Sequence, residues 1–369
     1  MIRTEFLVLL LALLAFGLGV VLTALIRWVG SSRDLLDSPG SPGHEKQLRG
    51  VPNIGGIAIF GAIILPLAGL LVWASAGSVH PVAQALRIDR DTIAVLIVCM
   101  FALHTMGLMD DRKPLPALVK LAAMVFVATA VVGLLDIRLL TVLDAQPGGV
   151  LLSMLLSIVW IVAITNAINF LDNMDGVCAG VTAVIAAVLV TVSLRAGDVA
   201  DAIVLGCLAG AALGFLVWNR PRASIFMGDG GSLVLGFLLG VMAIRVTYFD
   251  SEVQASPWTA VFVPLALFAV PIYDLCSVVV IRISQGRNPF VGDQQHFTHR
   301  MKQRGLSDRR TLFVVLGCCI ITGLSGLLML SLPPQLAPIA ALQVLLTLLV
   351  LGVYERGVLK LRTVGGTRR

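Results

Sequence analysis

Long apolar runs alternate with short polar segments along almost the whole chain. Most runs have the roughly 17–25 residues with which a helix spans a bilayer core of about 30 Å. The pattern predicts an all-α integral membrane protein, a multi-span bundle of about 11 (10–11) transmembrane helices, with ten as the alternative because the run at Ser232 is short. The runs are Phe6–Trp28, Ile54–Ala74, Thr92–Leu108, Ala117–Val132, Val150–Ile168, Val177–Leu194, Ala202–Val217, Ser232–Ile244, Ala260–Ile283, Leu312–Leu332 and Ile339–Tyr354.

The polar connections are too short to hold a soluble domain, so residues 1–369 are predicted to form a single polytopic membrane domain. Arg3 precedes the first run and no small-residue cleavage site follows it, which predicts a retained span rather than a signal peptide. The composition agrees, because 58% hydrophobic and 13% charged residues with a mean hydropathy of +0.96 exclude a soluble globular domain.

Basic residues are divided unevenly between the two sets of alternate connections. One set, with the C-terminal tail, holds roughly 18 Lys and Arg residues, and the other set holds about 6. The positive-inside rule therefore places the first set and the C-terminus in the cytoplasm. The net charge of +6 is spread over small loops, which argues against nucleic-acid binding. The six cysteines lie in or beside apolar runs without a CxxC pair and are predicted to be packing residues.

Six carboxylates stand at the ends of apolar segments on the predicted cytoplasmic side. A carboxylate at the edge of the bilayer is costly unless it is paired, hydrated or functional. Repulsion among six of them would be relieved by a divalent cation and a phosphate-bearing substrate, which predicts Mg²⁺-dependent phosphoryl chemistry at the membrane surface. They are Asp110, Asp111, Asp172, Asp175, Asp229 and Asp293.

The end of the third run combines acidic and basic side chains. Asp110 and Asp111 can both reach an aqueous pocket at a helix end, although a merely solvated helix end is the alternative. Lys120, one turn into the next run, can snorkel to the interface or bind an anionic lipid head group. Gly55-Gly56 allows close backbone approach, either to another helix or to a ligand.

The segment 166–176 carries polar side chains at every third position. On a helix, these positions would share one slowly drifting face. Two amides and two carboxylates form an array of hard oxygens suited to Mg²⁺ or to sugar hydroxyls, and a polar stripe that only packs helices is the alternative. The residues are Asn166, Asn169, Asp172 and Asp175.

Two later segments add glycine and histidine. Asp229 lies among glycines at the start of a run, where backbone N–H groups favour an anion, although a simple helix cap is the alternative. Asp293, His296 and His299 lie in the longest basic loop. They suit phosphate or sugar oxygens better than zinc, because no third soft ligand is near, and a solvated loop without a role is the alternative.

The ordered set of motifs resembles the polyprenyl-phosphate N-acetylhexosamine-1-phosphate transferases, the undecaprenyl-phosphate GlcNAc-1-phosphate branch in particular. The resemblance extends from Asp37 to about Arg310. The motifs that carry it are Pro52…Gly55-Gly56, Asp110-Asp111, Lys120-Leu121, Asn166…Asn169…Asp172…Asp175-Gly176, Asn219…Phe226…Asp229…Ser232, Pro271…Asp274 and Asp293…His296…His299.

The resemblance implies roles for three groups of residues. It implies that Lys120 binds the lipid phosphate, that Phe226 stacks on uracil and that Asn219 contacts the uridine. The implied catalytic residues are Asp110, Asp111 and Asp172. The implied substrate-binding residues are Lys120, Asn166, Asp175, Asn219, Phe226, Asp293, His296 and His299. The implied metal ligands are Asp229 and Asn169, for Mg²⁺ or for Mn²⁺ in its place.

Some positions depart from the family pattern. The stretch before Pro52 reads His44-Glu-Lys46-Gln47 where the family often has Arg-Lys-x-His, and Met124 replaces a usual Gln. Thr298 replaces a middle His, and the His-His-His-Phe-Glu run of the peptidoglycan branch is absent. These departures favour GlcNAc as the donor sugar.

The resemblance implies a reaction between UDP-GlcNAc and undecaprenyl phosphate that releases UMP and starts a cell-envelope polysaccharide. It implies a bacterial inner-membrane enzyme with its active site on the cytoplasmic face, and a possible partner in a second copy of the chain. Alternative donors are UDP-MurNAc-pentapeptide and UDP-GalNAc. Outside the enzyme class, an ion-coupled transporter and a structural scaffold are the alternatives. The transporter predicts an inverted repeat, which is not visible, and mid-membrane polar residues, of which Asp274 and Arg282 are the main ones.

Overall fold

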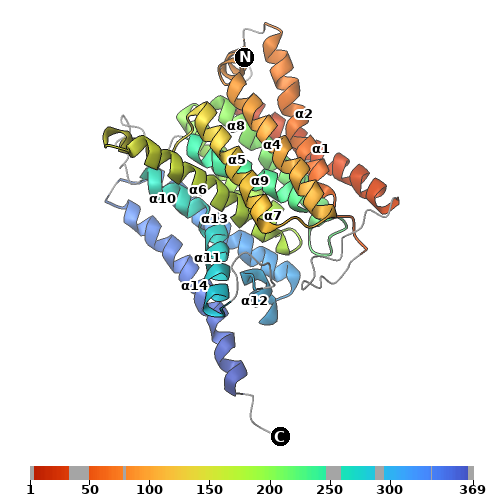
Figure 1. Cartoon of the computed structure of the whole chain (residues 1–369), viewed down its shortest axis with the longest axis vertical. Helices are drawn as coiled ribbons and strands as arrows, with labels where there is room; N and C mark the ends of the chain where they lie inside the picture. The colour runs from red at the N-terminus through yellow and green to blue at the C-terminus, as the bar shows by residue number, and fades with distance from the viewer. Residues whose placement is uncertain are drawn as a thin grey trace. The chain divides into compact units, whose positions relative to one another are not determined.

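Every regular element that the computed structural model describes is a helix, which confirms the predicted fold class (Figure 1). The described residues are 4–32, 50–77, 80–246, 259–286, 295–333 and 335–364, so the stretch from Asp37 to Gln47 and Asp293 lie outside them. The chain divides into two compact units, residues 1–247 and residues 248–369. A single membrane domain over 1–369 stays a prediction.

The first unit contains the helices that carry most of the predicted site residues. Two short 3₁₀ helices, η1 (Thr141–Ala145) and η2 (Leu171–Asn173), flank α6. The α-helices are α1 (Thr4–Ser32), α2 (Gly55–Ser75), α3 (Pro81–Ile88), α4 (Arg90–Arg112), α5 (Ala117–Leu135), α6 (Gly149–Phe170), α7 (Val177–Ala196), α8 (Val199–Asn219) and α9 (Asp229–Arg245).

Helix α9 is enclosed by its neighbours. Every residue from Gly230 to Ala243 is buried, and α9 packs against α2, α4, α6 and α7 (Figure 1). Glycine allows this close packing, because a Cβ at Gly236 would lie only 2.8 Å from the Thr165 Cα of α6. A helix that is apolar all round is expected to be surrounded by protein or lipid, and here protein surrounds it. The first residue of α9, Asp229, is thereby held at one end of the unit.

The second unit consists of α10 (Thr259–Leu267), α11 (Ala269–Ser284), α12 (Phe297–Gln303), α13 (Asp308–Ser331) and α14 (Ala337–Val364). The sequence predicts one helix over Ala260–Ile283, but α10 and α11 meet at an angle of 76° (Figure 1). Pro271 explains the break, because it has no N–H to donate to the carbonyl of Leu267 and its ring would clash with that carbonyl.

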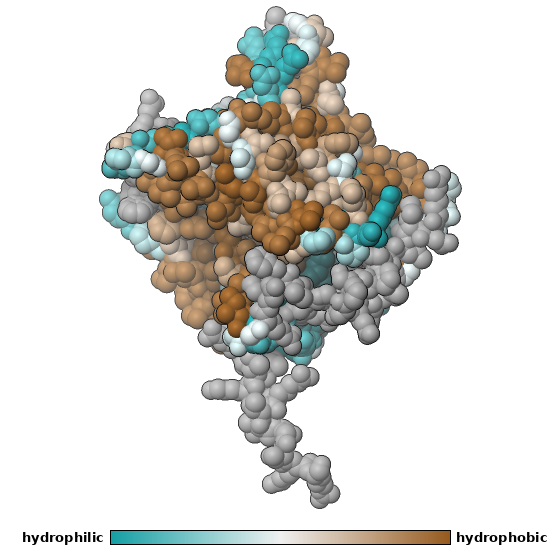
Figure 2. All heavy atoms as spheres, viewed as in Figure 1, coloured by the Kyte–Doolittle hydropathy of each residue, from teal (hydrophilic) through white to brown (hydrophobic). Residues whose placement is uncertain are grey.

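Nine helices among the described residues are long and apolar enough to cross a membrane, or up to ten if the bent pair α10–α11 counts as one span. The chain is therefore a multi-pass membrane protein, compatible with the predicted count. Apolar side chains such as Phe126 of α5 and Val98 of α4 remain exposed. Hydrophobic residues cover much of the face seen in Figure 2. Exposed apolar area of this extent suits contact with lipid.

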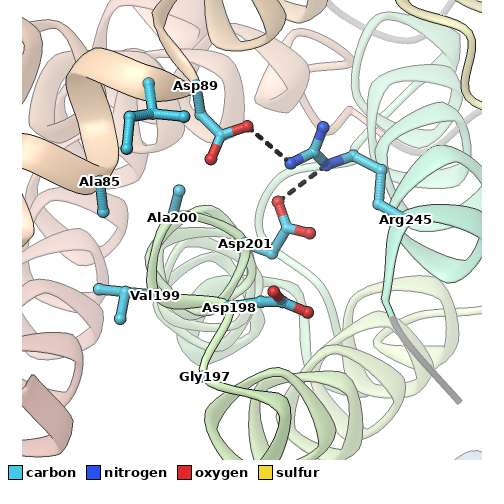
Figure 3. A pocket seen from close by; sticks show the side chains of 9 residues that line it. Ala85, Asp89, Gly197, Asp198, Val199, Ala200, Asp201 and Arg245 are labelled. Carbon is cyan, nitrogen blue, oxygen red and sulfur yellow. Dashed lines mark hydrogen bonds and ion pairs between the residues drawn. The ribbon is translucent and has the colours of Figure 1, made fainter. Parts of the chain in front are cut away.

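An ion-pair cluster joins three helix ends of the first unit. Arg245, the last residue of α9, donates from Nε to Asp201 at 2.8 Å and from Nη2 to Asp89 at 2.9 Å (Figure 3). Asp201 lies in the first turn of α8, and Asp89 directly precedes α4. A cavity of about 150 Å³ adjoins them. Because Asp229 begins α9 and Arg245 ends it, this cluster lies at the opposite end of the unit from Asp229.

Candidate active site

Several predicted site residues meet where α4 and α6 end and α5 and α9 begin. Asp110 and Asp111 lie in the last turn of α4, and Lys120 lies in the first turns of α5. Asn169 is the penultimate residue of α6, and Asp229 is the first residue of α9. The contacts below bring these five residues into one cluster, the acidic cluster.

Lys120 joins two of the carboxylates. Its Nζ donates to Asp110 Oδ2 at 3.0 Å and to Asp229 Oδ2 at 3.1 Å. Asn169 Nδ2 donates to the other oxygen of Asp229 at 2.9 Å and to Ser232 Oγ at 2.8 Å. The side chains of Asp110, Asp229 and Lys120 keep 13%, 21% and 27% of their exposure, so solvent reaches the cluster. One ammonium beside three carboxylates leaves an excess of negative charge that favours a cation.

Asp111 has partners different from those of Asp110. Its Oδ1 accepts the backbone N–H of Asp229 at 2.9 Å, and its Oδ2 accepts that of Gly230 at 3.1 Å. The N–H groups in the first turn of a helix have no partner within the helix, and Gly228, which precedes α9, has no side chain with which to cap them. Asp111 therefore caps α9 from a different helix.

The glycine pair that begins α2 closely approaches the backbone of another segment of the protein. Gly55 N donates to Phe226 O and Gly56 N donates to Met227 O, each at 2.9 Å. A Cβ at Gly56 would lie 2.4 Å from Gly231 N. The pair thus holds the segment that leads into α9 and carries Phe226, whose side chain is half-buried.

The predicted single helical face over segment 166–176 does not hold beyond Asn169. α6 ends at Phe170, and Asp172 lies in η2 with non-helical φ and ψ of −77° and 23°. Asn166 donates back into its own helix, to Val162 O at 2.9 Å. Only Asn169 of this series has a described hydrogen bond to Asp229.

Asp175 and Asn219 hold the loop between α8 and α9. Asp175 Oδ2 accepts the backbone N–H of Arg222 at 3.1 Å and that of the next residue at 3.0 Å. Asn219 is buried, accepts from Gly176 N at 2.9 Å and donates to Ile225 O at 2.9 Å. Both atoms of the Asn219 amide are therefore engaged within the protein.

In the second unit, Asp274 of α11 holds the start of α12. Asp274 is fully buried; its Oδ2 lies 2.8 Å from His296 Nδ1, and its Oδ1 accepts the backbone N–H of Phe297 at 2.9 Å. The two predicted histidines are neighbours, with ring centroids 6.5 Å apart. Burial, followed by the proximity of His296, lowers the pKa of His299. The sequence identifies Asp274 as a polar residue within an apolar run and as part of a family motif, but it does not indicate its partner.

One buried residue at the acidic cluster is not identified by the motifs. The Nδ1 of His104 lies 2.7 Å from the carbonyl oxygen of Gly230. The only signal in the sequence is a lone histidine inside an apolar run, seven positions before Asp111.

The fit of the cluster to a divalent cation follows from its donor atoms. Among the described residues, no group of three or more His, Cys, Asp or Glu side chains could hold a metal ion alone. Mg²⁺, however, is commonly bound through one or two carboxylates, with water and substrate phosphates completing its coordination. The carboxylates of Asp229 and Asp110 suit that arrangement. The acidic cluster contains neither the sulfur nor the imidazole ligands that are common in zinc sites.

Comparison with known proteins places these residues within a family. The profile of glycosyl transferase family 4 matches residues 93–247. A probable undecaprenyl-phosphate N-acetylglucosaminyl 1-phosphate transferase of Bacillus subtilis is 27% identical over 85% of this chain and 82% of its own length. A phospho-N-acetylmuramoyl-pentapeptide-transferase of Mycolicibacterium smegmatis is 32% identical over 68% of this chain and 78% of its own length.

A third relative is also more than 30% identical and is matched over two thirds of its length. The decaprenyl-phosphate N-acetylglucosaminephosphotransferase of Mycobacterium tuberculosis (strain CDC 1551 / Oshkosh) is 31% identical over 72% of this chain and 68% of its own length. The chain therefore belongs to glycosyl transferase family 4, the family of polyprenyl-phosphate sugar-phosphate transferases.

Proposed function

We propose that this chain transfers GlcNAc-1-phosphate from UDP-GlcNAc to undecaprenyl phosphate and releases UMP. The activities named for its relatives support a polyprenyl phosphate acceptor and a sugar-phosphate donor. The observation that carries the proposal is Lys120, held between Asp110 and Asp229 at the ends of apolar helices. At such a position, a lipid phosphate in the membrane and a donor in water can meet.

The reaction exchanges one phosphoanhydride for another. An oxygen of the lipid phosphate attacks the β-phosphorus of the donor and forms a new P–O bond. The bond from that phosphorus to the oxygen that bridges it to the α-phosphorus breaks, and UMP leaves with the bridging oxygen. Because the bonds formed and broken are alike, positioning and electrostatic stabilisation supply most of the catalysis.

The residues of the acidic cluster take separate roles in this proposal. Lys120 binds the lipid phosphate, and Asp110 orients or deprotonates it. Asp229 and the neighbouring Asn169 would hold Mg²⁺, or Mn²⁺ in its place. When bound, the metal ion would neutralise the charge of the diphosphate. Asp111 positions the Asp229 turn through its two hydrogen bonds to α9.

The remaining predicted residues are proposed to act on the donor. Phe226 stacks on the uracil, while Asp175 and Asn219 support the loop that carries it. Asp172 stays a catalytic candidate, and the polar contacts to the sugar nucleotide are proposed for Asn166, Asp293, His296 and His299.

We place the enzyme in the bacterial inner membrane with the acidic cluster and the C-terminus in the cytoplasm, in keeping with the distribution of Lys and Arg. The lipid-linked sugar would begin a cell-envelope polysaccharide, such as an O-antigen. A homodimer stays a prediction.

The test is UMP release by the purified protein with undecaprenyl phosphate, UDP-GlcNAc and Mg²⁺. Release should require both lipid and metal, stop with a chelator and return when Mg²⁺ is added. Asp229→Asn should lower the rate by about 10²–10³-fold, because one charged group at the reacting phosphates is lost. The control is Asp91→Asn, which removes an exposed carboxylate at the other end of the helix that carries Asp110 and should keep the rate.

Competition among donors tests the choice of sugar in the same assay. Release with UDP-MurNAc-pentapeptide or UDP-GalNAc but not with UDP-GlcNAc would keep the reaction and replace the donor. No release with any of the three would contradict the proposed reaction.

A further inference from the structure

His104 is a buried imidazole inside an apolar helix. It lies in α4, is 6% exposed and stacks on Phe60 of α2, with ring centroids 4.5 Å apart and planes 7° apart. A polar ring nitrogen in such surroundings is costly unless it is hydrogen-bonded. None of the roles proposed above for the transfer reaction uses this residue.

The hydrogen bond of His104 has a defined direction. Its Nδ1 lies 2.7 Å from Gly230 O, and a carbonyl oxygen can only accept, so Nδ1 carries the proton and donates. A carbonyl in the first turn of an α-helix already accepts the N–H four residues further on. The imidazole therefore gives the Gly230 carbonyl a second donor, in addition to the N–H that it accepts within α9. Gly230 directly follows Asp229.

The same face of α4 contacts this turn at three points. His104, Gly107 and Asp111 are spaced i, i+3 and i+7, which places them on one side of a helix. Asp111 accepts the N–H groups of the turn, and His104 donates to its carbonyl. Gly107 lies so close that a Cβ there would come within 2.4 Å of Gly230 N. The turn is therefore held by its N–H groups and its carbonyl at the same time.

We propose that His104 is a positioning residue for the transfer reaction. Its Nδ1–H, bonded to Gly230 O, sets the rotation of the first turn of α9 and so directs the Asp229 carboxylate toward Lys120 and Asn169. This inference rests on the proposed function, in which Asp229 holds the metal ion.

Two substitutions separate the hydrogen bond from the packing of the ring. His104→Phe keeps an aromatic ring against Phe60 and removes the donor, whereas His104→Asn places an amide N–H near the position of Nδ1. Thr105→Ala on the same helix is the control, because the Thr105 hydroxyl bonds only within α4 among the described contacts.

His104→Phe should lower kcat about tenfold or more, because displacement of a reacting group by about 1 Å can lower the rate up to 10²-fold. It should also raise the Mg²⁺ concentration that gives half-maximal rate and leave the KM for the lipid phosphate unchanged. His104→Asn should recover most of the rate. If His104→Phe matches Thr105→Ala in both parameters, or if His104→Asn is as impaired as His104→Phe, the proposal is overturned. Absence of UMP release by the unsubstituted protein would instead contradict the proposed function.

A second measurement does not depend on activity. The chain has five histidines, so ¹⁵N-histidine NMR of the full chain in detergent is simple enough to assign with single substitutions. A resonance with a protonated Nδ1 should disappear in His104→Asn, and a second one should belong to His296, which faces Asp274. An unprotonated Nδ1 at His104 would overturn the proposal whatever the rates are.

Discussion

At the residue scale, Asp110 and Asp111 have different partners although they are adjacent in the chain. Asp110 bonds to Lys120 and to the backbone N–H of Leu115, whereas Asp111 caps the start of α9. Neighbouring residues on a helix are about 100° apart around its axis, so one side chain faces the open cluster while the other faces α9. The sequence alone cannot distinguish these roles, because both carboxylates end the same apolar run.

This difference predicts that stability, rather than activity, will separate the two residues. Asp111→Asn should lower the free energy of unfolding by about 1.5–3 kcal/mol, since an amide N–H would face a backbone N–H where a charged acceptor stood. Asp110→Asn should cost less, because the amide oxygen can still accept the Leu115 N–H and Lys120 keeps Asp229 as its partner. Thermal unfolding of the two variants in detergent measures this. A larger loss for Asp110→Asn would contradict the roles proposed for the two residues.

Other site residues differ in how far the sequence can predict them. Lys120, Asn169 and Asp229 are predictable, because a charged or amide group in an apolar segment has few structural uses. His104 is not predictable, since a lone histidine in an apolar run carries no sign of the carbonyl it contacts. The resemblance assigns Asn219 and Asp175 to substrate binding, a role that stays a prediction, and their backbone partners become evident only in the folded loop.

At the element scale, the first turn of α9 lies between α2 and α4 with glycine on both sides. Gly56 and Gly107 let the two helices approach the turn to distances at which no Cβ fits. Most of the helices follow the predicted apolar runs closely, because run length and the need to satisfy backbone groups in a membrane leave few alternatives. The break between α10 and α11 is missed because a proline in an apolar run can either kink a helix or end it.

Two alanine substitutions on the same helix test the close approach. Gly56→Ala should destabilise the protein by about 1–3 kcal/mol through overpacking, and it should lower UMP release at least as much as stability, since the Cβ would displace the Asp229 turn. Gly69→Ala, with nothing within 4 Å of its Cβ position, should be neutral or slightly stabilising, by about 0.5–1 kcal/mol. Equal behaviour of the two variants in thermal unfolding and in the UMP assay would refute this account of Gly56.

At the scale of the whole molecule, two arginines in the less basic set of connections are paired within the protein. Arg245 bonds to Asp89 and Asp201, and Arg138 bonds to Asp136 and Asp144. Each of these arginines therefore lies beside two carboxylates and adds no net positive charge to its side. The positive-inside rule counts Lys and Arg rather than net charge, so the predicted orientation rests on the uneven number of basic residues in the two sets.

The predicted orientation can be measured with two matched cysteine variants, after the exposed native Cys276 is replaced by serine. Arg90 and Arg220 are both exposed and lie at opposite ends of the first unit. Arg90 begins α4, whose last turn carries Asp110 and Asp111, and Arg220 directly follows α8, whose first turn carries Asp201. A membrane-impermeant maleimide should label Arg90→Cys in intact spheroplasts and Arg220→Cys only after permeabilisation. The reverse labelling would place the acidic cluster outside the cell and exclude a cytoplasmic donor.

The enclosure of α9 also has a consequence for the response of the enzyme to its bilayer. With 17 residues, α9 is about 25 Å long, which is shorter than a hydrocarbon core of roughly 30 Å. Helices that face lipid adapt to such a mismatch by tilting or by deforming the membrane. α9 is surrounded by other helices and does not bear the mismatch itself. The carboxylate of Asp229 should therefore keep its place beside α4 and α6 when membrane thickness changes, while the lipid-facing helices tilt around it.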